Sequence, residues 1–374
     1  MNEEVKNEQM EGKQKKLAFA AIDKQYTTNI VSSKEKVQKG LEYVIWGTKN
    51  SYPQYISDLA DEVTVLRTVI NGIADYVCGE NIMIGHTPWQ EQVNGKGDTV
   101  EDVVRNLALD LARYGGFALN VIRNKMGSIA EVYYIDLKNL RSDEEGEFFT
   151  YSKKWNYSYG NYKVIKLPKF RPEGSEASSI YFYKNNYSTV YPLSPIAGDA
   201  AIAAETEKEI SRFHLNSIKN GFSANVIVNF NNGVPDDDLK DEIVDNLTEK
   251  FSGTENASRM MVSFNDNKDR AVTVEKVSAE DFSDRYQALA KSTKQEIYSA
   301  YRAQPVLFGL PAENLGFSNQ DITEAWKIFN KCVILPYQKV IKRAFETILG
   351  EKEILNIEPF SIDWTDDSKE DAVK

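Results

Sequence analysis

The apolar residues of this chain follow a helical period in five long segments. These segments, in which apolar residues recur every three or four positions, are residues 55–79, 99–114, 194–217, 278–302 and 322–348. Gly79, Gly115 and Gly221 lie at the ends of the first three segments, where glycine is a common stop signal. Pro336 lies inside the last segment, and because it lacks a backbone donor it should kink or divide that helix.

Between residues 117 and 192 the period changes to the alternation typical of strands. Apolar and aromatic residues alternate with polar ones in four runs, at residues 118–123, 129–135, 162–167 and 180–183. Turn residues separate the runs. We therefore expect an antiparallel meander of hairpins in a mixed sheet, with the first two helices packed on it. Further short strands are expected after Tyr43 and at residues 81–85.

A compact unit separates the third and fourth helices. Its pattern predicts a strand at residues 226–230, a helix at 236–251, a second strand at 260–264 and a third strand at 272–277. Asp236, Asp237 and Asp238 open the helix, where one of them is expected to be the N-cap and the others to complement the helix dipole. The alternative is that these carboxylates are ligands of a two-metal nuclease site.

Composition and charge limit the classes of function. The 374 residues are 41% hydrophobic and 27% charged, as in ordinary soluble proteins, and no apolar run is long enough to cross a bilayer. Cys78 and Cys332 are the two cysteines, so we expect a reducing compartment and no disulfide framework. A net charge of −11 argues against binding nucleic acid through one large basic patch, but it is compatible with a channel along which DNA slides.

The sequence contains no convincing catalytic constellation. His86 and His214 have no neighbouring residues at metal-ligand spacing, and no phosphate-binding Gly-x-x-x-x-Gly-Lys motif occurs. We therefore expect a protein without enzymatic activity, cofactor or metal. The aromatic residues between 148 and 191 are interleaved with lysines and could stack on single-stranded nucleic acid. Alternation along strands instead predicts that half of these aromatic side chains are core residues.

Several short motifs, in a fixed order, resemble the C-terminal core of bacteriophage portal proteins, the rings through which tailed phages package and eject DNA. The motifs are Ala303-Gln-Pro-Val-Leu-Phe-Gly309, Phe317-Ser-Asn-Gln-Asp321, Phe329 and Leu335-Pro336. The helix–βαββ–helix order is also similar to the stem of portal proteins, in which a clip module interrupts an antiparallel helix pair. Trp46-Gly-Thr-Lys-Asn-Ser-Tyr-Pro53 resembles the segment before the first helix in some portals.

The resemblance implies an α+β, portal-like fold with an α/β wing domain, long antiparallel stem helices interrupted by a small βαββ clip, and a kinked channel helix. The expected divisions are a flexible N-terminal arm (1–40), the wing with its hairpins (41–193), the first stem helix (194–222), the clip (223–277), the second stem helix (278–303), the tunnel loop (304–319), the kinked channel helix (320–350), and a short C-terminal strand with an acidic tail (351–374). Any crown domain is expected to be minimal or missing, and residues 357–364 are expected to return as an edge strand to the wing.

The resemblance also implies the function and the partners. We expect a homo-oligomeric ring of twelve subunits at one capsid vertex, in the virion and, during assembly, in the host cytoplasm. Its expected partners are double-stranded DNA bound without sequence preference, the large terminase subunit, head-completion or neck proteins, and the major capsid protein or a scaffold. The residues expected to face DNA from the tunnel loop are Gln304, Pro305, Gly309, Leu310, Pro311, Asn314, Phe317 and Asn319. Those expected to dock the motor and neck proteins are Asn231, Asp236, Asp237, Asp238 and Lys240.

Two alternatives to the portal hypothesis remain at the level of sequence. The chain could be a non-enzymatic oligomeric adaptor or scaffold protein with no DNA channel, or, less in keeping with its motifs, an enzyme that uses carboxylates of the wing. Without the resemblance, Gln304-Pro305 and Leu310-Pro311 would be interpreted as a helix-terminating linker, because the residue before proline disfavours helical dihedral angles.

Overall fold

The computed structural model describes residues 30–85, 92–155, 164–219, 226–230, 235–237, 239–243, 260–264, 279–309 and 319–360. Several expected features lie outside these residues. They are most of the N-terminal arm, the third strand of the compact unit at 272–277, much of the helix at 236–251, the interval 310–318 and the acidic tail.

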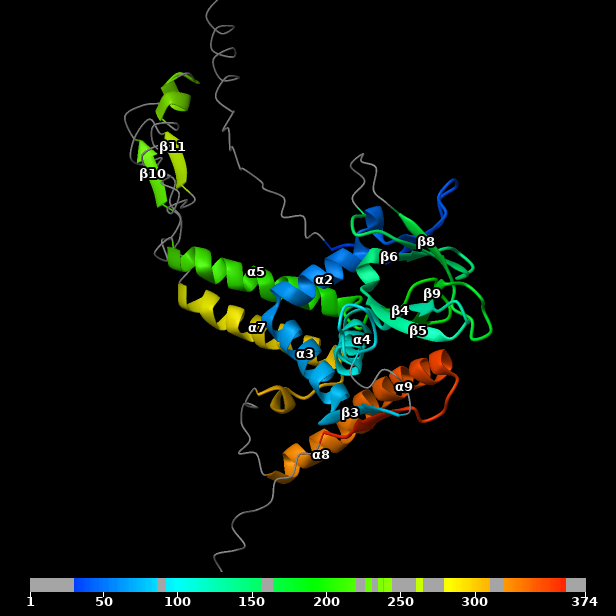
Figure 1. Cartoon of the computed structure of the whole chain (residues 1–374). Helices are drawn as coiled ribbons and strands as arrows, with labels where there is room; N and C mark the ends of the chain where they lie inside the picture. The colour runs from blue at the N-terminus through cyan, green and yellow to red at the C-terminus, as the bar shows by residue number, and fades with distance from the viewer. Residues whose placement is uncertain are drawn as a thin grey trace, which may run out of the picture.

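Three helices form one layer of the main body (Figure 1). They are α2 (Tyr52–Glu62), α3 (Thr64–Cys78) and α4 (Val100–Tyr114). The single helix expected at 55–79 is thus wrong, because Val63 interrupts it in an extended conformation (φ −91°, ψ 110°). Val63 is buried, and the break lets α2 and α3 each pack on α4. α4 begins at the capping box of Thr99 and Asp102 and ends at Gly115, which adopts the left-handed conformation.

The strands between residues 116 and 184 form two separate antiparallel sheets. In the first, β4 (Gly116–Arg123) lies between β5 (Ile129–Ile135) and β9 (Ser178–Lys184). In the second, β7 (Phe148–Tyr151) lies between β6 (Leu140–Ser142) and β8 (Ile165–Pro168). The expected strands are present, but the single mixed sheet is wrong. The 3₁₀ turn Leu137–Asn139 follows β5, and β6 then pairs with β7 instead of continuing the first sheet.

Two long helices extend from this body side by side (Figure 1). They are α5 (Asp199–Lys219) and α7 (Ala279–Ala300), which correspond to the helices predicted at 194–217 and 278–302. Their contacts run in opposite directions along the chain, since Phe213 stacks on Tyr286 while Glu207 contacts Thr293. At their far ends β10 (Val226–Phe230) pairs in parallel with β11 (Met260–Phe264).

The last long helix is divided by a π-helical turn. α8 (Asn319–Phe329) leads into the π-helical residues Asn330–Ile334 and then into α9 (Leu335–Leu349). The Leu335 N–H donates to the carbonyl of Asn330, one residue further back than in an α-helix. The division expected at Pro336 is therefore present, and it takes the form of a π-turn immediately before this proline.

The core continues from the helical layer to the C-terminal segment. β12 (Leu355–Glu358) pairs antiparallel with β3 (Asn81–Ile84), with Ile357 opposite Ile82. The expected return strand thus begins two residues earlier than predicted, and residues 361–364 lie outside the described part of the chain. At the other end, β1 (Glu35–Lys36) pairs with β2 (Ile45–Trp46). No described helix is both long and apolar enough to cross a membrane.

Candidate functional site

The connection between α7 and α8 contains the residues predicted to face DNA. Gln304 is extended and exposed, Pro305–Phe308 forms a 3₁₀ turn, and Gly309 is left-handed with φ 77°. Asn319 is the first residue of α8. The other predicted loop residues, Leu310, Pro311, Asn314 and Phe317, lie outside the described part of the chain.

The described part of this connection is fixed to the core. The Tyr76 hydroxyl on α3 donates a hydrogen bond to the carbonyl oxygen of Leu307, whose side chain is buried. The Phe308 ring contacts Tyr76 and Phe329, with ring centroids 6.0 and 5.7 Å apart. A segment from Pro305 to Phe308 is therefore not a free loop. Leu307 and Phe308 hold it against α3, and it ends at the exposed Gly309, from which the chain continues toward α8.

Of the five predicted docking residues, the structure describes Asp236, Asp237 and Lys240. The Asp236 carboxylate accepts a hydrogen bond from the Leu239 N–H at 3.0 Å, so Asp236 is the N-cap of the helical turn that follows. Asp237 pairs with Lys240 at 2.8 Å, and hydrogen bonding from the Lys240 ammonium lowers the pKa of this carboxyl. Asn231 and Asp238 lie outside the described residues.

These contacts favour the structural interpretation of the acidic cluster over the metal-ligand one. Asp236 and Asp237 are engaged by a backbone N–H and an ammonium group. Among the residues that the structure describes, no group of three or more His, Cys, Asp and Glu side chains is placed to hold a metal ion.

The α5–α7 pair has an aromatic contact and a polar contact. The Phe213 and Tyr286 rings stack with centroids 4.6 Å apart, and His214 meets the edge of the Tyr286 ring at 6.0 Å. Nearer the main body, the Glu207 carboxylate accepts from the Thr293 hydroxyl at 3.1 Å and pairs with the Lys294 ammonium at 3.5 Å. Two independent contacts thus set the register of the two helices.

Most of the described aromatic residues between 148 and 191 are buried or half-buried, and Phe148 and Tyr187 are exposed. Phe149, Phe170 and Tyr191 are buried, and Tyr191 stacks on Trp46 with ring centroids 4.3 Å apart. Phe148, in contrast, is 44% exposed. This burial supports the structural interpretation over a surface that stacks bases, as strand alternation predicts.

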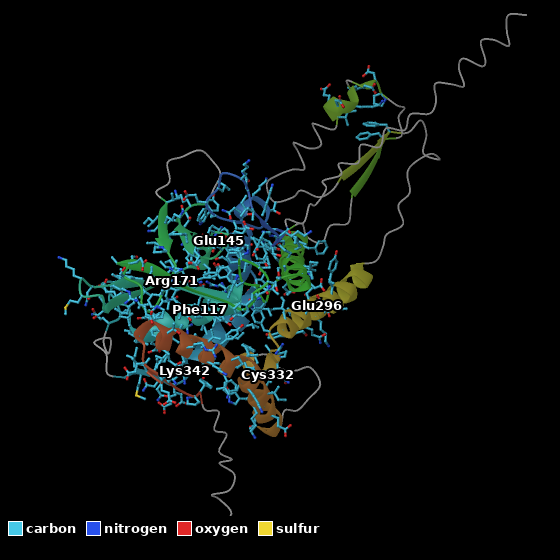
Figure 2. The ribbon with its side chains drawn as sticks, turned by 90° about the vertical axis from the view of Figure 1, so that its right-hand side faces the viewer. Phe117, Glu145, Arg171, Glu296, Cys332 and Lys342 are labelled. Carbon is cyan, nitrogen blue, oxygen red and sulfur yellow. The ribbon has the colours of Figure 1, made fainter. Side chains whose placement is uncertain are left out.

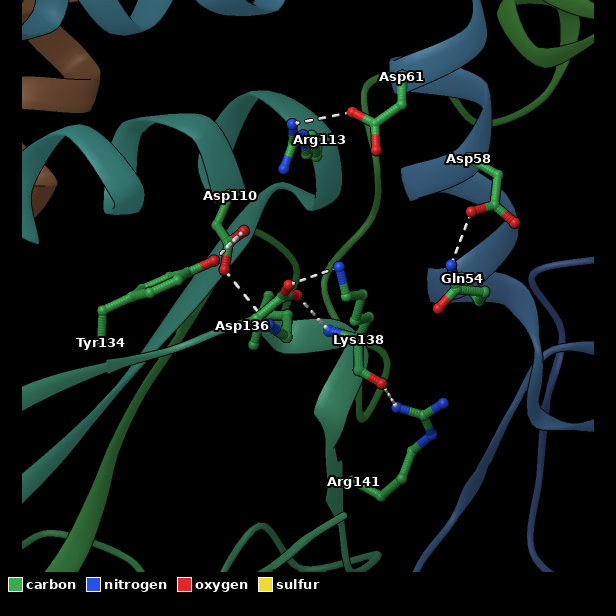
Figure 3. Close-up of polar contacts among 10 residues, drawn as sticks. Gln54, Asp58, Asp61, Asp110, Arg113, Tyr134, Asp136, Lys138 and Arg141 are labelled. Atoms are coloured by element: carbon green, nitrogen blue, oxygen red, sulfur yellow. Dashed lines mark hydrogen bonds and ion pairs between the residues drawn. The ribbon is translucent and has the colours of Figure 1, made fainter. Parts of the chain in front are cut away.

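Two buried ionisable side chains were not identified from the sequence (Figure 3). Asp110 on α4 accepts hydrogen bonds from the Tyr134 hydroxyl at 2.9 Å and from the Leu137 N–H at 3.4 Å. Burial, and next the nearby Asp136 carboxylate, raise the pKa of Asp110 well above its ordinary value. A signal was available, because Asp110 lies three residues after Leu107 and seven after Val103, on the apolar face of the helix.

Arg141 in β6 is the second such side chain. Its guanidinium donates to the Asn50 side-chain oxygen at 2.5 Å, to the Asn50 carbonyl at 2.9 Å and to the Leu140 carbonyl at 2.7 Å. It also lies over the Trp155 ring, 4.7 Å from the centroid. Arg141 therefore joins the segment before α2 to the second sheet. Its position at the start of a short strand gave no signal of burial.

The helix α9 bears a shallow, open hollow on its surface. The side chains that line it come from this one helix and are Leu335, Gln338, Lys339, Lys342, Arg343 and Glu346. Gln338 is buried and donates to the Val77 carbonyl at 3.0 Å, which fixes α9 to α3. Half of its lining side chains are basic, namely Lys339, Lys342 and Arg343, and one, Glu346, is acidic.

Comparison with solved structures shows the fold. The neck of a native gene transfer agent particle, computed with C12 symmetry, matches with a TM-score of 0.52 and 15% identity, over 84% of this chain and 86% of that chain. An HK97-family phage portal protein from Corynebacterium diphtheriae matches with a TM-score of 0.52 and 11% identity, over 81% of this chain and 95% of that chain. Among curated protein sequences none matches significantly.

Comparison with protein families shows the family. The family described as phage portal protein matches residues 94–363, which include both three-stranded sheets, the α5–α7 pair and the divided helix. The portal function predicted from the short motifs around Pro305 and Pro336 is therefore confirmed. This chain belongs to the phage portal protein family.

Proposed function

We propose that twelve copies of this chain form a ring at one vertex of a phage or prophage capsid, through which double-stranded DNA is packaged and ejected. The observation that carries this proposal is the antiparallel pair α5 and α7, which extends from the main body and bears the β10–β11 unit at its far end. The similarity to a gene transfer agent neck computed with C12 symmetry supports the ring and its place in the virion.

In this proposal α5 and α7 are the stem helices, and the unit containing β10 and β11 is the clip. The two helices of a stem must keep their register while DNA moves past them. The stacking of Phe213 on Tyr286 and the hydrogen bond between Glu207 and Thr293 favour this role. The clip would dock the large terminase subunit during packaging and head-completion or neck proteins afterwards. The wing would contact the major capsid protein or a scaffold during assembly in the host cytoplasm.

The interval from Leu310 to Phe317 is the proposed tunnel loop. Its anchor at Leu307 and Phe308 supports this role, because a loop that meets moving DNA needs a fixed base. Its contacts with DNA would be directed at the backbone, since packaging accepts every sequence. The work of packaging would come from a separate motor, and this chain would be a conduit and docking platform without catalytic activity.

Negative-stain electron microscopy and mass photometry of the purified full chain test this proposal. We expect rings with a central hole and a mass of about 509 kDa, that is, twelve chains of 42.4 kDa. Since a ring can require a scaffold, the chain is also purified after co-expression with its neighbouring capsid genes. Monomers or dimers in both preparations would contradict the ring and favour the alternative, an oligomeric adaptor with no DNA channel.

A further inference from the structure

The charge of this chain is unevenly distributed, and one segment has the opposite sign to the whole. The net charge is −11, yet residues 325–345 contain five basic residues and no Asp or Glu. The five are Lys327, Lys331, Lys339, Lys342 and Arg343, which we call the basic stripe. They belong to α8, the π-helical turn and α9, and Figure 2 labels Lys342 on this divided helix.

The basic stripe consists of two pairs of neighbours on the divided helix. Lys327 and Lys331 are four residues apart, as are Lys339 and Arg343, so the members of each pair share a helix face, and the π-helical turn separates the two pairs. Lys339, Lys342 and Arg343 together line the shallow hollow on α9. At the helical rise of about 1.5 Å per residue the stripe is roughly 24 Å long.

Four basic residues elsewhere in the main body are neutralised by carboxylates. Arg105, Arg113, Lys208 and Arg171 each pair with a carboxylate of another element. Within the described ranges none of the five stripe residues forms an ion pair. Glu346, at the end of the hollow, is engaged by the Glu353 N–H at 3.0 Å. Within the described residues no carboxylate thus lies within 4.0 Å of a stripe nitrogen, and Glu346 is the one acidic side chain in the lining of the hollow.

The predicted tunnel loop cannot supply this charge. Residues 304–319 contain no Lys or Arg and one acidic residue, Glu313. A protein that tracks a DNA backbone neutralises phosphates with Lys and Arg, and the first cluster of these after the loop is the stripe. A row of basic residues without acidic residues between them also fits an extended polyanion such as DNA better than it fits another protein. Protein surfaces carry positive and negative charges close together.

We propose that the basic stripe on α8 and α9 is the surface of this chain that contacts the sugar-phosphate backbone of double-stranded DNA. This inference relies on the proposed portal function and assigns the main phosphate contacts to the helix after the loop. The contacts are to phosphates, so binding is independent of base sequence and falls steeply with salt. In a ring the stripe is repeated in each subunit, and weak contacts are summed.

The test is fluorescence anisotropy of a labelled duplex with the full-length chain across a series of salt concentrations. The test variant is K327Q/K331Q/K339Q, and its matched control is K36Q/K153Q/K154Q. All six lysines are exposed, and both variants change the net charge equally. We expect the test variant to bind at least about tenfold more weakly at low salt and to reduce the slope of log affinity against log salt by up to about 3. The control is expected to match the wild type.

Other outcomes separate this inference from the proposed function. The assignment to the stripe would be overturned, even if rings form normally, by either of two results. One is an equal loss of duplex affinity in the two triple variants. The other is a test variant whose duplex affinity and salt slope are unchanged. A wild-type chain that binds no duplex at low salt would also overturn the assignment. If the test variant kept its duplex affinity and lost its rings, the stripe would be an interface between subunits. The variant K327R/K331R/K339R, which keeps the charge, is expected to retain wild-type binding.

Discussion

Gly72 of α3 lies directly against the ring of Phe308, where the connection between α7 and α8 meets the core. A Cβ added at Gly72 would be 2.7 Å from both Cδ1 and Cε1 of Phe308. This distance is well inside normal contact, so the ring occupies space that is available only because residue 72 has no side chain. The contact couples the first helical layer to the base of the proposed tunnel loop.

Gly72→Ala is expected to lower the free energy of unfolding by about 1–2 kcal/mol, because the methyl group displaces the Phe308 ring from its packed position. In a Phe308→Ala background the same change should be neutral or stabilising by up to about 1 kcal/mol, since alanine favours helix more than glycine does. A double-mutant cycle by urea denaturation measures this coupling. An equal effect of Gly72→Ala in both backgrounds would refute the contact.

Asp110→Asn is expected to remove a specific pH dependence of stability. The pKa of Asp110 is raised in the folded protein, so above the ordinary value of 3.8 the folded state retains a proton that the unfolded state loses. The wild type therefore loses stability as the pH rises from 3.8 toward the raised pKa, and below 3.8 the group contributes no pH dependence.

The amide cannot ionise, so the difference in unfolding free energy between the variant and the wild type should grow in favour of the variant across that pH range. Urea denaturation at several pH values measures the difference. A difference that stayed constant with pH would show that Asp110 ionises in the folded protein as readily as in the unfolded one.

Arg141→Ala is expected to lower the free energy of unfolding by about 3–5 kcal/mol. The change leaves the Asn50 side chain and the carbonyls of Asn50 and Leu140 without their buried donor. Arg141→Lys should recover only a small part, because an ammonium group cannot reproduce the planar fork. The matched control is Arg171→Ala, which removes an exposed pair with Glu147 and should cost under about 1 kcal/mol. Similar losses at the two arginines would contradict the buried role.

Gly79→Ala is expected to detach β12 from β3. Gly79 has φ 67° and ψ −153°, and a Cβ there would lie 1.9 Å from the carbonyl oxygen of Glu358. Gly97→Ala is the control, since Gly97 has φ 86° but no atom within 4 Å of an added Cβ. The control measures backbone strain alone, about 1–2 kcal/mol. Gly79→Ala should cost at least about 2 kcal/mol more in thermal unfolding, and equal costs would argue against the close contact.

Most elements follow from local patterns that the sequence states clearly. The capping box at Thr99 and the glycine at 115 mark the ends of α4, and the alternation around Val121 marks β4. The break at Val63 has no such marker. Val63 is an apolar residue within an apolar period, and it becomes extended because α2 and α3 pack in different directions on the same core.

The site was less accessible to sequence reasoning than the fold. Pro336 predicts a disturbed helix, but the local pattern does not specify the π-turn before it, on either side of which Phe329 and Ile341 are buried. The proline at 305 is compatible with a free linker. Its fixed position depends on Tyr76 and Gly72, which are more than 200 residues away in the sequence, and a local pattern contains no information on such contacts.

The most direct test of the account is a cryo-electron microscopy reconstruction of the assembled full-length chain. We expect a closed ring of twelve subunits, with residues 310–317 nearest the axis, the β10–β11 unit at one end, and the basic stripe facing the path of DNA. A ring with residues 310–317 on its outer surface, or a compact assembly without a central channel, would contradict it.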